Sequence, residues 1–222
     1  FGGMFIQGLG ERAQSAIPLA VTCGCAGIIV GVVTMTGLGL KMANGLVALA
    51  GGSLWLTMIF TMLCSIVLGM GVPTTANYII QATISAPALV ALGVPKLAAH
   101  MFVFYFGIVA DITPPVALAA FAGSGIAGSN PMKTGFTATR LGIAAYIVPY
   151  MFVLNPILVL VNVDNLSTGL FILMAIKAIV TAFVGMVGLA SGSTGFFKTN
   201  CKLWERILLI AGGLLLIDPG TI

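Results

Sequence analysis

The chain alternates between long apolar segments and short stretches rich in glycine, proline and polar residues. The apolar segments cover residues 17–40, 54–68, 76–92, 97–128, 141–162, 168–190 and 203–217. A helix needs about 20 residues to cross the roughly 30 Å hydrocarbon core of a bilayer. Segments 17–40, 141–162 and 168–190 have this length as single helices, whereas the others are shorter or interrupted. The pattern predicts an all-α polytopic membrane protein.

Residues 54–92 form two apolar runs on either side of the sequence GMGVPTT at 69–75. The first run has 15 residues, and as a helix it would measure about 22 Å, which is less than the bilayer core. Two helices that stop short and meet at a Gly/Pro/Thr turn indicate a re-entrant hairpin. Two complete crossings joined by a tight turn are the alternative.

Residues 97–128 form one apolar segment that the sequence DITPP interrupts at 111–115. A continuous helix of this length would measure about 48 Å, too long for one comfortable crossing and too short for two. The two adjacent prolines lack N–H donors and obstruct the preceding turn. We therefore expect a discontinuous helix that is unwound near its middle. We expect polar loops at 129–139 and from Ser191 onward, before a final short span at 203–217.

The composition excludes several classes of protein. Charged residues make up only 6% of the 222 residues, against about 25% in soluble domains. A soluble globular enzyme, a nucleic-acid-binding protein and a disordered tail are therefore excluded, because each needs more polar surface. The chain starts at Phe1 with no recognisable signal peptide, and we expect it to be a piece of a longer polypeptide.

The basic residues predict an orientation in the membrane. If residues 54–92 return to the side they left, Lys41 and Lys96 share one side and six Lys or Arg residues share the other. The six are Arg12, Lys133, Arg140, Lys198, Lys202 and Arg206. The side with six should be cytoplasmic. A hairpin that crosses twice gives the same count, so the charges leave both interpretations open.

Two helix breaks within about 45 residues predict a binding site. Irregular backbone at membrane depth is costly unless it lines a cavity or is buried in protein. Freed carbonyl and hydroxyl oxygens suit Na⁺, and the N-termini of half-helices attract anions. We therefore expect a joint cation and anion site near mid-membrane. The alternative is that both breaks are kinks that only help packing.

The candidate site residues come from both breaks. At the hairpin tip they are Gly69, Gly71, Pro73, Thr74, Thr75 and Asn77. In the broken helix they are Asp111, Thr113, Pro114, Pro115 and Ala117. We expect Na⁺ to bind at Gly71, Thr74 and Thr113.

Asp111 is the only acid well inside an apolar segment, which makes it a functional candidate. It could coordinate a cation, relay protons, or cap the half-helix that follows, and Thr113 could also provide the cap. Enzymatic interpretations are weak. An intramembrane aspartyl protease needs two facing acids, and no phosphate-binding loop is present. We therefore expect no enzymatic activity and no cofactor apart from this Na⁺ ion.

The stretch from about residue 26 to 156 resembles the fused permease of tripartite ATP-independent periplasmic (TRAP) transporters. The resemblance is to the DctM-like large membrane subunit, of the subtype that works with TAXI-type binding proteins. It rests on residues 27–39, 68–75, 100–106, 111–120 and 130–135. The pair of GMGVPTT and ITPPV motifs at this separation is the most specific part.

This resemblance implies a Na⁺-driven, elevator-type importer of organic acids in the cytoplasmic (inner) membrane of a bacterium or archaeon. Its partners would be a periplasmic TAXI-type solute-binding protein, the N-terminal half of the same permease and the lipid bilayer. Residues 1–190 would form the C-terminal member of two inverted repeats. Residues 191–222 would add a polar loop and a truncated last span. A non-transporting scaffold subunit and a channel are the alternatives.

Overall fold

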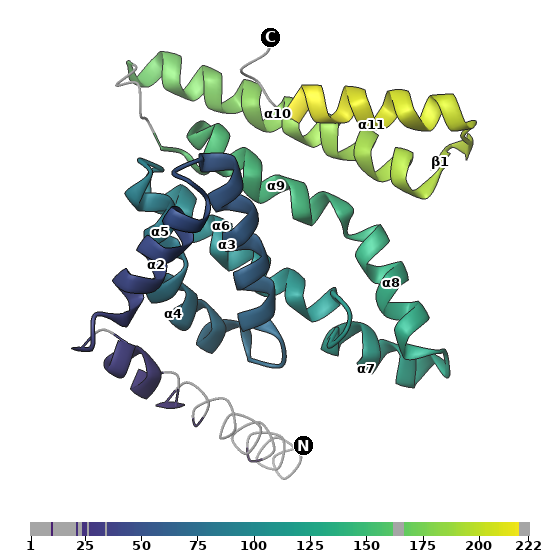
Figure 1. The fold of residues 1–222 in the computed structure, drawn as a ribbon. Helices are drawn as coiled ribbons and strands as arrows, with labels where there is room; N and C mark the ends of the chain where they lie inside the picture. Colours follow the sequence, from purple (N-terminus) through teal and green to yellow (C-terminus); the bar gives the residue numbers. More distant parts are fainter. Residues whose placement is uncertain are drawn as a thin grey trace.

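The computed structural model describes residues 10, 21, 24–25, 27–33, 35–161 and 167–217. These residues are predominantly helical, as predicted (Figure 1). The helices are α2 (Leu38–Leu49), α3 (Leu54–Gly69), α4 (Thr74–Ile84), α5 (Ala86–Ala91), α6 (Lys96–Val109), α7 (Leu118–Ala127), α8 (Pro131–Leu141), α9 (Ile143–Leu154), α10 (Thr168–Thr194) and α11 (Leu203–Ile217). The 3-10 turns are η1 (Ala110–Ile112) and η2 (Pro156–Val159), and the short strands are β1 (Phe196–Phe197) and β2 (Thr199–Asn200).

One helix among the described residues, α10, is long and apolar enough by itself to cross a bilayer. Its 27 residues measure about 40 Å. Two bent pairs also qualify if each pair is counted as one span. The first joins Gly27–Val33 to α2 at 73°, and the second joins α8 to α9 at 42°.

The centre of the fold is an apolar cluster where α3, α5, α6 and α9 meet. Phe102 and Phe106 of α6 are fully buried there. Their rings pack edge-to-face with each other at 4.8 Å and with Tyr150 of α9 at 5.3 and 5.8 Å. This packing fixes the helix whose C-terminal end leads into the predicted break.

The helices α10 and α11 lie side by side as a hairpin, above the rest of the molecule in Figure 1. Glycines allow their backbones to approach closely. A Cβ added at Gly185 would lie 2.6 Å from the carbonyl oxygen of Gly213, and one at Gly192 would lie 3.0 Å from that of Arg206. The strands β1 and β2 form the antiparallel turn between the two helices.

Two arginines converge on the carboxyl end of α10. The guanidinium of Arg206 donates to the carbonyl oxygens of Gly192 at 2.9 Å and Ser193 at 3.1 Å. The guanidinium of Arg140, from α8, donates to the same Ser193 carbonyl at 3.0 and 3.2 Å. Cations at this position complement the negative end of the helix dipole.

The predicted transmembrane helix at 17–40 is interrupted in its described part. The helix Gly27–Val33 is followed by a turn, and α2 then begins after Gly37. Gly37 has φ 66°, which glycine adopts without the steric cost that a Cβ brings. The rest of this predicted segment lies largely outside the described residues.

The predicted polar loop at 129–139 is wrong, because α8 occupies most of it. The side chain of Asn130 accepts a hydrogen bond from the backbone N–H of Lys133 at 3.1 Å, and Pro131 lies in the first turn. Both are standard signals of a helix start. The low apolar content of this segment had favoured a loop.

The carboxyl ends of two other helices differ from the predicted ends, and Asn, Pro or Gly residues lie at the observed ends. The helix predicted at 141–162 ends at Leu154, because Pro156 follows and Asn155 accepts a bond from the N–H of Ile157. The helix predicted at 168–190 continues to Thr194 and ends at Gly195, with φ 80°. The helix α11 has the bounds predicted for the last apolar segment, 203–217.

Candidate functional site

The hairpin tip is a short turn between α3 and α4. The helix α3 ends at Gly69, and Gly71 has φ 75°. Pro73 precedes the first residue of α4, Thr74. The predicted Gly/Pro/Thr turn is therefore present. The amino end of α4 has no side-chain cap, so its first N–H groups are not used by a neighbouring side chain.

The broken helix is interrupted where the sequence predicts. The helix α6 ends at Val109 and continues into η1, and α7 begins only at Leu118. Between them Thr113 is extended, and the Pro114–Pro115 peptide bond is cis. Ala117 has φ 35°, a left-handed conformation that costs a residue with a Cβ about 1–2 kcal/mol. The amino end of α7 is also uncapped by any side chain.

The two breaks lie together. They line one open hollow of about 380 Å³. The hairpin contributes Gly71, Val72, Pro73, Thr74 and Thr75, and the broken helix contributes Asp111, Leu118 and Ala119. The sequence predicted that these segments would meet, and the structure places both at one site.

Asp111 lies in η1, is half-buried and lines the hollow. The residue at the amino end of α7 is Ala117, and no side chain caps that helix. The capping alternative for Asp111 and Thr113 is therefore not the arrangement seen. The carboxylate of Asp111 belongs to the hollow, where it could neutralise a cation.

Thr113 is held away from the hollow. Its hydroxyl donates to the carbonyl oxygen of Val109 at 2.6 Å and lies 2.5 Å from the hydroxyl of Tyr146, in α9. The next contact comes from α8, where the hydroxyl of Thr139 donates to the carbonyl oxygen of Ile112 at 2.9 Å. Thr113 therefore helps to hold the unwound segment against α8 and α9.

Gly135 and Gly142 allow α8 to lie directly on the break. A Cβ at Gly135 would lie 3.1 Å from Pro114 and 3.6 Å from the side chain of Ala117. A Cβ at Gly142 would lie 2.7 Å from the side chain of Ile112. Pro114 and Ala117 thus face α8, whereas Pro115 is exposed.

Asn77 points into the protein behind the tip. It is 1% exposed, and its side-chain oxygen accepts a bond from the amide of Gln81 at 2.6 Å. That amide also donates to the carbonyl oxygen of Ser65 in α3, at 3.1 Å. A Cβ at Gly69 or Gly107 would lie 2.9 or 2.6 Å from the amide nitrogen of Asn77. Asn77 and Gly69 therefore support the hairpin rather than line its hollow.

The sequence analysis missed several residues at this site. Gln81 lies one turn beyond Asn77 on the same helix face, so an i, i+4 polar pair in an apolar segment was the available signal. Leu118 and Ala119 line the hollow only because α7 starts there. Tyr146 and Thr139 gave no local signal, because their contacts to the break span 33 and 27 residues.

The residues around the hollow offer hard oxygen atoms. They include the Thr74 and Thr75 hydroxyls and the Asp111 carboxylate, and unwound backbone supplies carbonyl groups. Among the described residues no group of three His, Cys, Asp or Glu could hold a metal ion. Such oxygen atoms are ligands that hard cations prefer.

Interrupted apolar helices that meet at a hollow lined by an acid and two threonines are typical of membrane transporters. The chain belongs to the DctM family: the model of the tripartite ATP-independent periplasmic transporter, DctM component, matches residues 4–166. Members work with a periplasmic solute-binding protein and a small membrane subunit. A second family, a domain of unknown function called DUF3394, matches residues 175–222. Neither the search of curated proteins nor that of solved structures found a match.

Proposed function

We propose that the protein is part of a Na⁺-coupled secondary transporter that imports organic acids. A periplasmic TAXI-type solute-binding protein would deliver the substrate, and an elevator-type movement would carry it across the inner membrane. The N-terminal half of the same permease would supply the first of the two inverted repeats. The proposal rests on one observation, that the hairpin tip and the helix break line the same hollow.

The helix ends at the hollow favour an anionic substrate. The first residues of α4, Thr74 and Thr75, and those of α7, Leu118 and Ala119, all line it. Neither helix has a side-chain cap. Free N–H groups and the positive ends of two helix dipoles therefore face the same space, which favours a substrate carboxylate.

The cation would bind beside this anion. Gly71 can offer its carbonyl oxygen, Thr74 its hydroxyl and Asp111 its carboxylate. The hydroxyl of Thr113 is already bonded to Val109 and Tyr146, so Thr113 would act by holding the unwound segment in place. Coupling would follow because a bound cation offsets the charge of the substrate in the same hollow.

Uptake by the full-length protein in liposomes, with its small subunit and purified binding protein, tests this function. We expect accumulation of an organic acid that requires a Na⁺ gradient. Uptake that survives removal of the gradient would contradict Na⁺ coupling. Passive flux in both directions would indicate a channel, and absence of any flux would indicate a scaffold.

A matched pair of variants tests the site. Thr74→Val removes one cation ligand, so we expect the Na⁺ concentration for half-maximal uptake to rise about tenfold. The control is Thr137→Val in α8, where the hydroxyl is exposed and bonds only to the carbonyl of Lys133. An unchanged Na⁺ response in Thr74→Val would show that the cation binds elsewhere.

A further inference from the structure

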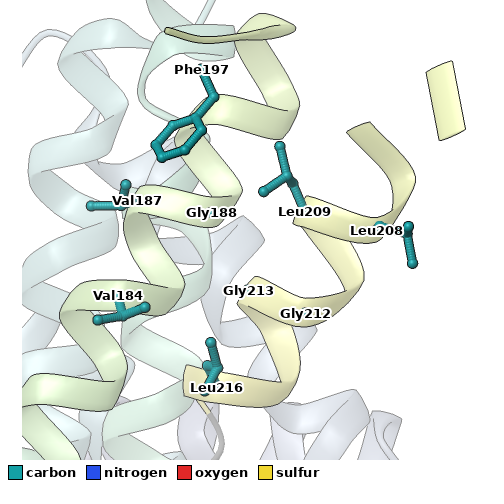
Figure 2. Close-up of a pocket in the computed structure, with 9 residues that line it drawn as sticks. All are labelled: Val184, Val187, Gly188, Phe197, Leu208, Leu209, Gly212, Gly213 and Leu216. Carbon is teal, nitrogen blue, oxygen red and sulfur yellow. The ribbon is translucent and has the colours of Figure 1, made fainter. Parts of the chain in front are cut away.

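The hairpin of α10 and α11 carries an apolar groove of about 240 Å³ on one side (Figure 2). Val184 and Leu208, which line it, are 51% and 61% exposed, so the groove faces outward. Gly188 and Gly212 also line it. A Cβ at Gly212 would meet nothing within 4 Å, so the space beside this helix is empty. We call this feature the C-terminal groove.

The groove continues toward the β1–β2 turn and becomes polar there. An adjoining hollow of about 420 Å³ shares Phe197 with the groove and adds Thr199, Trp204 and Glu205. Figure 2 shows Phe197 at the end of the groove opposite Leu216. One continuous surface therefore passes from purely apolar to polar along the hairpin.

Two lysine side chains lie near the β1–β2 turn, toward which the surface becomes polar. Lys198, at the tip of the β-turn, and Lys202, just before α11, are both exposed. Arg206 is already bonded to the carbonyls of α10. The Glu205 carboxylate accepts a bond from the backbone N–H of Lys202 at 2.7 Å and keeps its negative charge. Three cations, Lys198, Lys202 and Arg206, outnumber this carboxylate between Phe196 and Arg206, so the net charge of this stretch is positive.

The length of the groove indicates its occupant. The groove lies along Leu208–Leu216 of α11, and with the adjoining hollow, which Trp204 lines, the surface extends twelve residues along this helix, or about 18 Å. One leaflet of a bilayer contributes about 15 Å of hydrocarbon, and a spanning helix needs about twice that. The groove thus fits an acyl chain of one leaflet rather than another transmembrane helix. Exposed Trp204 and Phe197 suit the membrane–water interface.

We propose that the C-terminal groove binds one anionic phospholipid. Its acyl chain lies along Gly188 and Gly212, and its phosphate lies between Lys198 and Lys202. This gives the part of the chain that matches the domain of unknown function a role in lipid binding. The proposal does not depend on the transported solute or on Na⁺ coupling.

Native mass spectrometry of the purified full-length protein tests the groove, with phosphatidylglycerol and phosphatidylcholine as probes. Gly212→Leu projects a side chain into the groove, so we expect it to abolish retention of phosphatidylglycerol. The matched control is Gly169→Leu in α10, which makes the same change at a position outside the groove where a Cβ would also meet nothing within 4 Å. Equal retention by both variants would overturn the proposal.

A second set of variants tests the headgroup contact. Lys198→Gln and Lys202→Gln should each weaken retention of phosphatidylglycerol about fivefold and leave phosphatidylcholine unchanged. Lys133→Gln, the same loss of charge on exposed α8, should change neither. Equal binding of both lipids by the unmodified protein would refute the preference for an anionic headgroup. A dimer that replaces the lipid adduct would show that a second copy fills the groove.

Discussion

Glycine brings helices together in two regions of the molecule, and the groups it accommodates differ. Behind the hairpin tip, Gly69 and Gly107 make room for the buried amide of Asn77. In the C-terminal hairpin, Gly185 and Gly213 make room for each other's backbone, with a Cβ-to-carbonyl distance of 2.6 Å. The first region encloses polar side chains, whereas the second encloses backbone and apolar side chains.

The glycines behind the hairpin tip therefore support the candidate site, whereas those between α10 and α11 serve helix packing. Around the hairpin the described residues include three buried side-chain atoms without a hydrogen-bond partner: Thr61 Oγ1, Ser65 Oγ and Gln81 Oε1. Buried polar groups of this kind reduce stability. No such atom is found among the described residues of α10 and α11. We therefore expect changes in the C-terminal hairpin to affect mainly folding, and changes behind the tip to affect mainly transport.

The largest loss of stability should come from Gly185→Val. The new side chain would meet the carbonyl oxygen of Gly213 at 2.6 Å, and backbone cannot move aside as a flexible side chain can. We expect the free energy of unfolding to fall by about 3 kcal/mol, measured by thermal unfolding in detergent. Gly169→Val on the same helix, where a Cβ meets nothing, is the control. If the two variants unfold at similar temperatures, close backbone packing at Gly185 does not stabilise the C-terminal hairpin.

Gly107→Ala should have a smaller effect on stability and a larger one on transport. Its Cβ would lie 2.6 and 3.0 Å from the amide nitrogens of Asn77 and Gln81. Those side chains can shift, and the lost hydrogen bonding should cost about 1–2 kcal/mol. Because the same side chains support the hairpin, Na⁺-dependent uptake should fall sharply. Gly45→Ala in exposed α2 is the control. Normal uptake by folded Gly107→Ala would contradict this role.

Arg206→Gln tests the polar end of the C-terminal hairpin. It removes two bonds to carbonyl oxygens at the end of α10. We expect a loss of about 1 kcal/mol in the free energy of unfolding, with uptake by the folded protein unchanged. A change in the Na⁺ response of this variant would mean that the hairpin acts on the site.

Ala117→Gly should give the smallest effect and the opposite sign. Glycine relieves the left-handed strain at φ 35° but adds freedom to the unfolded chain, so the net gain in stability should be about 0.5 kcal/mol. Chemical unfolding of both proteins in the same detergent measures this. A clear loss of stability would show that the packing of the Ala117 methyl group against Gly135 contributes more than the backbone strain costs.

Much of the site followed from the sequence because its signals are local. Glycine and proline mark the turn at 69–75 and the break at 111–115, and the structure places both where the sequence indicated. The helix at 131–141 was missed because a polar helix has no apolar run, although Asn130 and Pro131 carried the cap signal.

Side-chain directions at the breaks could not be predicted. An unwound turn has no helical periodicity, so nothing in the sequence shows which way the Thr113 hydroxyl points. Its bond to Tyr146 depends on how α9 packs. Asn77 lies in a regular helix, but it faces inward because Gly107 leaves room for it. Such non-local packing decides which candidate residues reach the hollow.

The carbonyl of Ser193 joins the two family regions of the chain. It accepts bonds from Arg140, which lies in the DctM match, and from Arg206, which lies in the DUF3394 match. Hydrogen bonds to one carbonyl oxygen therefore connect the region that matches DctM with the region that matches DUF3394. Transplanting the C-terminal hairpin onto another permease would therefore restore these hydrogen bonds only where that permease has an arginine at the position of Arg140.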